Sequence, residues 1–211
     1  NYFSYDYEQP EDDVPFATHV EVGPCPWAPD HRLAKIGLKG VEMDANERPP
    51  LNLVFLLDVS GSMSSSKKLP LVKQGMTMLA ETLRRKDHVA IVTYAGNAKT
   101  VLPPTSGRDM GTIMDAINQL SSGGSTAGAA GIQQAYDVVQ ENYDPEAVNR
   151  IILCTDGDFN VGVSRFEDLL QIVEEKTDET GAFITILGFG MGNLKEGQLE
   201  QLADSGDGNY G

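Results

Sequence analysis

Five oxygen-bearing side chains occupy positions that suit a metal site, and they are Asp58, Ser60, Ser62, Thr126 and Asp156. The first three alternate along the chain directly after an apolar run, so in an extended or turning segment their side chains can point to one side. Thr126 starts a predicted helix behind a glycine-rich turn, and Asp156 comes two residues after the end of another apolar run. Carboxylate and hydroxyl oxygens together suit a hard cation such as Mg²⁺ or Mn²⁺, which retains waters and open coordination positions.

The elements that must position these side chains alternate in type after Pro50. Short apolar runs predict strands at 51–57, 88–95, 150–154 and 182–189. Apolar residues that recur every three or four positions predict helices at 69–83, 110–120, 126–139, 166–173 and 196–203. This alternation predicts an α/β fold, with a doubly wound, mainly parallel sheet of about six strands and helices on both faces.

Two of the candidate ligands stand where such a fold binds its ligands. Open α/β sheets bind ligands at the carboxyl ends of their parallel strands, which is where Asp58 and Asp156 are expected. The short run 99–102 follows the second strand too closely for a crossover, so it predicts one antiparallel edge strand.

Residues 1–49 differ from the rest of the chain. They are rich in proline and acidic residues, show no helical period, and carry two predicted strands at 18–22 and 33–43. We expect a β-rich N-terminal extension over 1–49, with its strands beside the central sheet, and one α/β domain over 50–211. Both ends of the sequence are typical of a fragment, so a targeting segment is expected to lie outside it.

The composition excludes several kinds of partner. With 31 Asp and Glu against 16 Lys and Arg among 211 residues, the net charge is −15, and so acidic a surface repels nucleic acid and anionic membranes. The longest apolar run, 53–57, is far shorter than the roughly 20 residues that cross a bilayer, so we expect no membrane insertion within this chain. Cys25 and Cys154 allow at most one disulfide, and the sequence leaves open whether they pair.

The three ligand segments resemble a known family motif. Asp58-x-Ser60-x-Ser62, Thr126 five residues before Gly131, and Thr155-Asp156-Gly157 are similar to the metal-ion-dependent adhesion site (MIDAS) of von Willebrand factor type A (VWA) domains. The resemblance covers nearly the whole chain, with the type A domain from about residue 50 onward. It extends to a bacterial branch of uncharacterised, often exported VWA proteins.

The resemblance implies a function and a role for each ligand. The hydroxyls of Ser60, Ser62 and Thr126 would bind the metal directly, and Asp58 and Asp156 would act directly or through water. The expected cofactor is Mg²⁺, with Mn²⁺ or Ca²⁺ as alternatives. Because neutral hydroxyls leave the cation's charge poorly compensated, the site would accept an Asp or Glu carboxylate from a protein partner. The implied function is a noncatalytic, adhesion-type module with an extracytoplasmic location.

Two other functions stay open on the sequence. A Mg²⁺-dependent phosphohydrolase of haloacid-dehalogenase type also places a nucleophilic Asp at the end of an apolar strand. It needs a second carboxylate two residues later to protonate the leaving group, where this chain has Ser60. An intracellular subunit that docks on an AAA-type ATPase fits the same motif, and a signal peptide or lipoprotein cysteine in the complete gene product would discriminate against it.

Overall fold

In the computed structural model of the protein, the described residues are 5–11, 14–42, 44, 47–124, 128–157, 166–190 and 195–211. The chain divides into two compact units, Asn1–Arg48 and Pro49–Gly211. Each unit contains a sheet of its own.

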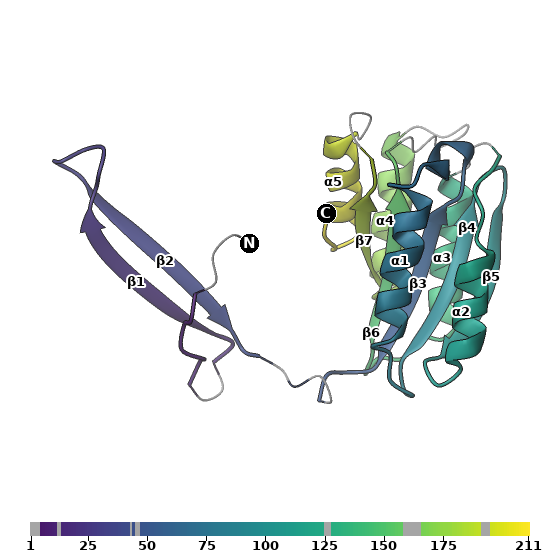
Figure 1. Ribbon diagram of the computed structural model, residues 1–211, viewed down its shortest axis with the longest axis horizontal. Coiled ribbons are helices and arrows are strands. Elements are labelled where there is room, and N and C mark those ends of the chain that lie inside the picture. Colours follow the sequence, from purple (N-terminus) through teal and green to yellow (C-terminus); the bar gives the residue numbers. More distant parts are fainter. Residues whose placement is uncertain are drawn as a thin grey trace. The chain divides into compact units, whose positions relative to one another are not determined.

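The first unit is an antiparallel hairpin. Strand β1 (Phe16–Pro24) pairs along its whole length with β2 (Arg32–Gly40) (Figure 1). The connection between them closes on itself, because the Cys25 amide donates a hydrogen bond to the His31 carbonyl at 3.2 Å. The two strands therefore pair with each other in a separate two-stranded sheet, in place of extending the central sheet as the sequence predicts.

The second unit is built on a five-stranded sheet with the order β5-β4-β3-β6-β7. Its strands are β3 (Leu51–Asp58), β4 (His88–Tyr94), β5 (Ala98–Ser106), β6 (Val148–Thr155) and β7 (Phe183–Gly188). Neighbouring strands are parallel except β4 and β5, which confirms the predicted antiparallel edge strand. The sequence predicts about six strands, and among the described residues the sheet has five, with one isolated parallel bridge between Ile186 and Tyr210.

Helices cover both faces of this sheet, which confirms the doubly wound α/β fold (Figure 1). They are α1 (Leu69–Ala80), α2 (Met110–Gln119), α3 (Gly128–Glu141), α4 (Phe166–Thr180) and α5 (Glu196–Ser205). Successive residues of a strand point to opposite faces, so β3 serves two cores. Leu53, Phe55 and Leu57 pack with α1 and α2, whereas Val54 and Leu56 pack with the other three helices.

The described helices share one further property: none combines the length and the apolar composition that crossing a bilayer requires.

The parallel strands place the predicted ligand loops at one edge of the sheet. β3 lies between β4 and β6, and in its pairing with β6 Leu57 stands opposite Cys154. Asp58 ends β3, and Asp156 follows the last residue of β6, so both leave the sheet at its carboxyl edge. The fold thus brings together two acids that are far apart in sequence.

Candidate metal site

Asp58 is the innermost residue of the site. Its side chain is fully buried at the end of β3. One carboxylate oxygen, Oδ1, accepts a hydrogen bond from the backbone amide of Ser60 at 2.9 Å, and Oδ2 accepts one from the Thr155 hydroxyl at 3.3 Å. The carboxylate therefore ties the loop after β3 to the end of β6.

Ser60 directly precedes a single turn of 3-10 helix, Gly61–Ser64, and Ser62 lies within that turn. Their hydroxyl oxygens lie 3.0 Å apart and share a hydrogen bond. Adjacent ligands of an octahedral Mg²⁺, at bond lengths of about 2.1 Å, are also about 3.0 Å apart. The separation of the two hydroxyl oxygens therefore fits two neighbouring positions around such a cation.

Asp156 brings a second carboxylate to the same edge. Its side chain is 3% exposed, and Oδ2 forms an ion pair with the Lys68 ammonium at 2.8 Å. The pKa of Asp58 is raised, first by burial and further by the negative charge of Asp156, while hydrogen bonds from Ser60 and Thr155 oppose the rise. Two buried carboxylates that repel each other make an environment in which a cation is stabilising.

Thr126, the remaining predicted ligand, lies outside the described residues. The segment directly before it is bound to the loop after β3. The Gly61 amide donates a hydrogen bond to the Gly124 carbonyl at 3.1 Å, and the Gly123 amide donates one to the Val59 carbonyl at 2.7 Å. Gly124 has a φ of +89°, a conformation that favours glycine, so the glycine-rich turn allows the chain to pass close to this loop.

Three further residues contact the site and are not among the predicted ones. Thr155 belongs to the quoted motif with Asp156, but no role is predicted for it. Tyr94 is fully buried at the end of β4, opposite Asp58 in the sheet, and burial together with the charge of that carboxylate raises its pKa well above the ordinary value. Lys68 gives no signal in the sequence, because only the tertiary fold brings it to Asp156.

The donor chemistry of this edge suits a hard cation. Within the described ranges, no three His, Cys, Asp or Glu side chains gather in a group that could hold a metal ion. A cation at this edge would therefore take the two carboxylates together with hydroxyl and water oxygens, which Mg²⁺ and Mn²⁺ accept and softer metals do not favour. The side chains that are present fit the predicted group.

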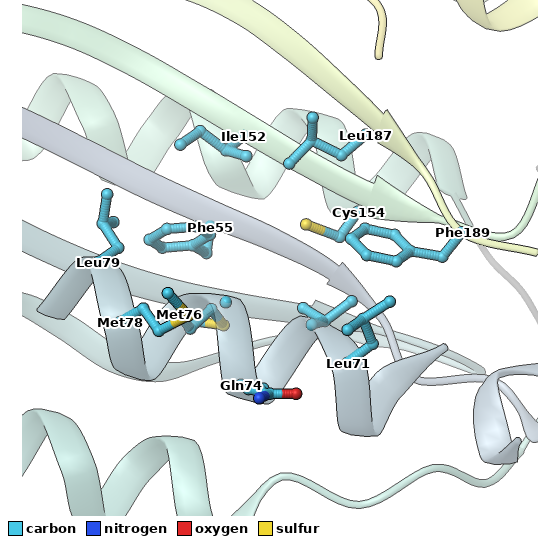
Figure 2. Close-up of a pocket in the computed structure, with 12 residues that line it drawn as sticks. Phe55, Leu71, Gln74, Met76, Met78, Leu79, Ile152, Cys154, Leu187 and Phe189 are labelled. Atoms are coloured by element: carbon cyan, nitrogen blue, oxygen red, sulfur yellow. The ribbon is translucent and has the colours of Figure 1, made fainter. Parts of the chain in front are cut away.

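A separate hollow in this unit is apolar. It has a volume of about 470 Å³, and side chains of β3, β6 and β7 face α1 across it (Figure 2). Cys154 lines it, and burial raises the pKa of this thiol to about 12, so the thiol stays protonated at neutral pH. Both cysteines, Cys25 and Cys154, are free thiols. The hollow offers apolar surface but no reactive group.

Comparisons with known proteins agree with this architecture. A family model described as von Willebrand factor type A domain matches residues 52–210, and one described as von Willebrand factor matches residues 1–35. The uncharacterized protein YfbK of Escherichia coli (strain K12) is 40% identical over 197 residues, which cover 93% of this chain. The match covers 34% of YfbK, so this chain spans about a third of the length of that relative.

Solved structures share the fold at lower identity. A von Willebrand factor type A structure from Catenulispora acidiphila has a TM-score of 0.66 at 20% identity, covering 98% of this chain and 48% of that one. Proximal thread matrix protein 1 from the mussel byssus, with a zinc-occupied MIDAS motif, has a TM-score of 0.61 at 20% identity, covering 74% and 42%. With the family match over most of its length, the chain belongs to the von Willebrand factor type A domain family.

Proposed function

We propose that this chain is a noncatalytic, divalent-metal-dependent protein-binding module of the adhesion type. The observation that carries the proposal is the pair of hydroxyl oxygens on Ser60 and Ser62, 3.0 Å apart, beside two buried carboxylates. We assign Ser60, Ser62 and Thr126 as direct ligands of Mg²⁺, with Mn²⁺ or Ca²⁺ as alternatives. Asp58 and Asp156 complete the set, directly or through water.

The proposed ligands differ in what they contribute. Asp58 holds the amide of Ser60 and so orients the loop that carries both serine hydroxyls. Ser60 and Ser62 supply neutral oxygens, so positive charge remains at the site for an acidic partner. When bound, the cation supplies an electrophilic position for a partner's carboxylate. The partner we propose is a protein that presents an Asp or Glu side chain at its surface.

The same geometry supports a binding function over the phosphohydrolase. A nucleophilic aspartate must reach its substrate, whereas Asp58 is fully buried and both its oxygens accept hydrogen bonds. The position of the general acid, two residues later, holds Ser60, whose hydroxyl is far too weak an acid to protonate a leaving group at neutral pH. Both observations support a binding function over this chemistry.

Metal binding tests the site directly. We expect electron paramagnetic resonance to show Mn²⁺ bound to the wild-type chain, with EDTA removing it while the circular dichroism spectrum stays unchanged. Asp58→Asn should weaken Mn²⁺ binding by roughly 10- to 100-fold, because it removes one of the two negative charges beside the cation. Asp115→Asn makes the same change on an exposed position of α2 and should leave the affinity unchanged.

Partner binding is tested with two short peptides that differ only in one central residue, Glu or Gln. The Glu peptide should displace water from protein-bound Mn²⁺ and lower the water-proton relaxation rate, and the Gln peptide should not. Equal behaviour of the two peptides would contradict a carboxylate-accepting site. Hydrolysis of p-nitrophenyl phosphate that Asp58→Asn abolishes would contradict the noncatalytic function and favour the phosphohydrolase.

We also propose an extracytoplasmic location, in the periplasm or at the cell surface. The support is that a thread matrix protein of the mussel byssus shares the fold, together with the sequence resemblance to often exported bacterial proteins. Fractionation of cells that express the complete gene product tests this. Recovery in the cytosol would contradict it and favour the ATPase-docking subunit.

A further inference from the structure

Lys68 places a positive charge at the candidate metal site. Its ammonium nitrogen lies 2.8 Å from Oδ2 of Asp156, and the side chains are 18% and 3% exposed. The carboxylates of Asp58 and Asp156 lie at the same edge, close enough for the charge of Asp156 to raise the pKa of Asp58 in addition to burial. The lysine therefore neutralises part of the negative charge that would attract a divalent cation to this site.

The backbone of Lys68 is held on both sides. Its amide donates a hydrogen bond to the Ser65 carbonyl at 3.0 Å, and its carbonyl accepts one from the Val72 amide, also at 3.0 Å, in the first turn of α1. The Lys68 side chain therefore starts from a hydrogen-bonded backbone at the beginning of α1, whose Leu69 and Val72 are buried. Because the backbone is already ordered here, placing the ammonium beside Asp156 costs only the rotamer freedom of the side chain.

The loop after β7 leaves room for the lysine. A methyl group at Gly190 would lie 3.3 Å from Cε of Lys68 and 4.0 Å from its nitrogen, and Gly190 has a φ of +139°. Three segments therefore meet around the ammonium: the start of α1, the end of β6 with Asp156, and the glycine turn after β7. The position of the ammonium group is therefore determined by tertiary contacts among all three segments.

We propose that Lys68 is a built-in monovalent competitor of the divalent cation, which occupies Asp156 in the metal-free protein and weakens metal binding. This inference rests on the proposed function, because it concerns the same site. A positive charge beside a divalent cation is repulsive, and the repulsion is strong at short range in a poorly solvated edge. A partner's carboxylate adds negative charge and offsets that repulsion, so the lysine makes metal and acidic partner bind together.

Calorimetric titration with Mn²⁺ alone tests the competition. Lys68→Met removes the charge, and Lys68→Gln removes the charge while it keeps a hydrogen-bond donor for Asp156. Both variants should bind Mn²⁺ at least about fivefold more tightly than the wild-type chain. Lys67→Met removes the same charge from the exposed neighbouring residue and should stay within about twofold of wild type, because solvent screens it.

Thermal unfolding in EDTA and in Mn²⁺ gives a second measurement. Without metal, Lys68→Met should melt at a lower temperature than wild type because the ion pair between Lys68 and Asp156 is lost. Mn²⁺ should raise its melting temperature by more than it raises that of wild type. If Lys68→Met does not fold without metal, Lys68→Gln, which preserves a polar contact, decides the question.

The outcomes separate this inference from the proposed function. Mn²⁺ binding by all proteins, with Lys68→Met and Lys68→Gln equal to or weaker than wild type, would overturn the competition and leave the metal site standing. It would make Lys68 a residue that positions Asp156. Mn²⁺ binding by none of the proteins would overturn the metal site and the competition together. Tighter binding by both variants, with Lys67→Met unchanged, supports the competition.

Discussion

The two ends of β3 and β6 both carry buried polar side chains, and they use them differently. At the amino end, Asn52 stands opposite Asn149 across the two strands. The side-chain amide nitrogen of Asn52, Nδ2, donates hydrogen bonds to the carbonyls of Val139 and Asn142 and to the side-chain oxygen of Asn149, at 2.9–3.0 Å. The side-chain amide of Asn149 in turn donates a hydrogen bond to the Asp144 carbonyl at 2.7 Å. These side chains join strand ends to the loops beside them.

Asp87, directly before β4, is a charged side chain at the amino end of the sheet that is also held by neighbouring groups. Its buried carboxylate accepts hydrogen bonds from the Leu51 amide at 3.0 Å and from the Arg84 backbone amide at 2.6 Å. The Arg84 guanidinium pairs with the same carboxylate, at 3.2 Å. The charge is neutralised by a group three residues away and by the backbone of the neighbouring segment.

At the carboxyl end, the polar groups face one another. Ser60 and Ser62 share a hydrogen bond between their hydroxyls, and the negative charge of Asp156 contributes to raising the pKa of Asp58. Buried polar groups that are satisfied by local backbone are explained by stability alone. Like charges and hydroxyls that converge are better explained by a ligand, so this comparison separates the structural end of the sheet from the binding end.

The largest expected effect is at the structural end. Asp87→Ala should lower the free energy of unfolding by about 3–5 kcal/mol, because it removes a buried ion-pair partner of Arg84 and the acceptor of the Leu51 and Arg84 backbone amides. Urea denaturation measures the loss, with Asp115→Ala on the exposed side of α2 as the control. The folded fraction of Asp87→Ala should keep the wild-type affinity for Mn²⁺. A loss below about 1 kcal/mol would place Asp87 with the surface ion pairs and weaken the comparison.

A smaller effect of the opposite sign, an increase in stability, is expected for Asp58→Asn in EDTA. Its folded-state pKa is raised above the unfolded value, so the folded protein binds the proton more tightly, and stability falls as pH rises from the unfolded pKa through the folded one. Asp58→Asn carries no such charge, and its amide can still pair with Ser60 and Thr155. We expect the variant to melt above wild type at neutral pH and to lack this pH slope.

Thermal melts of metal-free wild type and Asp58→Asn, from about pH 4 to about pH 7, measure that slope. The matching change at the structural end, Asp87→Asn, should lower the melting temperature over the same range. If both substitutions destabilise the protein alike, Asp58 is a structural carboxylate and the two ends of the sheet do not differ.

The smallest effect on stability is expected at Ser62. Its side chain is exposed, so Ser62→Ala should change the free energy of unfolding by no more than about 0.5 kcal/mol. The same substitution should weaken Mn²⁺ binding, because it removes one of the two adjacent hydroxyl ligands. Ser64→Ala, in the same 3-10 turn, serves as the control and should leave Mn²⁺ binding unchanged. Equal affinities of the two variants would remove Ser62 from the ligand set.

The elements of the second unit could be predicted because each buries a stripe or run of apolar residues. The run 51–57 becomes β3 and the run 150–154 lies within β6, since a strand buried on both faces is mostly apolar. Helix ends were less predictable. α1 ends at Ala80 although the apolar period reaches Leu83, and α4 continues to Thr180 on polar residues.

By itself, the sequence determined the order of strands and helices after Pro50 and the loop with Asp58, Ser60 and Ser62, because apolar period and spacing within one loop are local properties. Only the tertiary structure decided that Lys68 meets Asp156 and that Asn52 meets Asn149. It also decided that β1 and β2 form a separate sheet. These contacts join segments that are distant along the chain or choose among equally possible strand pairings. Their partners are therefore selected by the packing of whole elements, which no local pattern of residue types records.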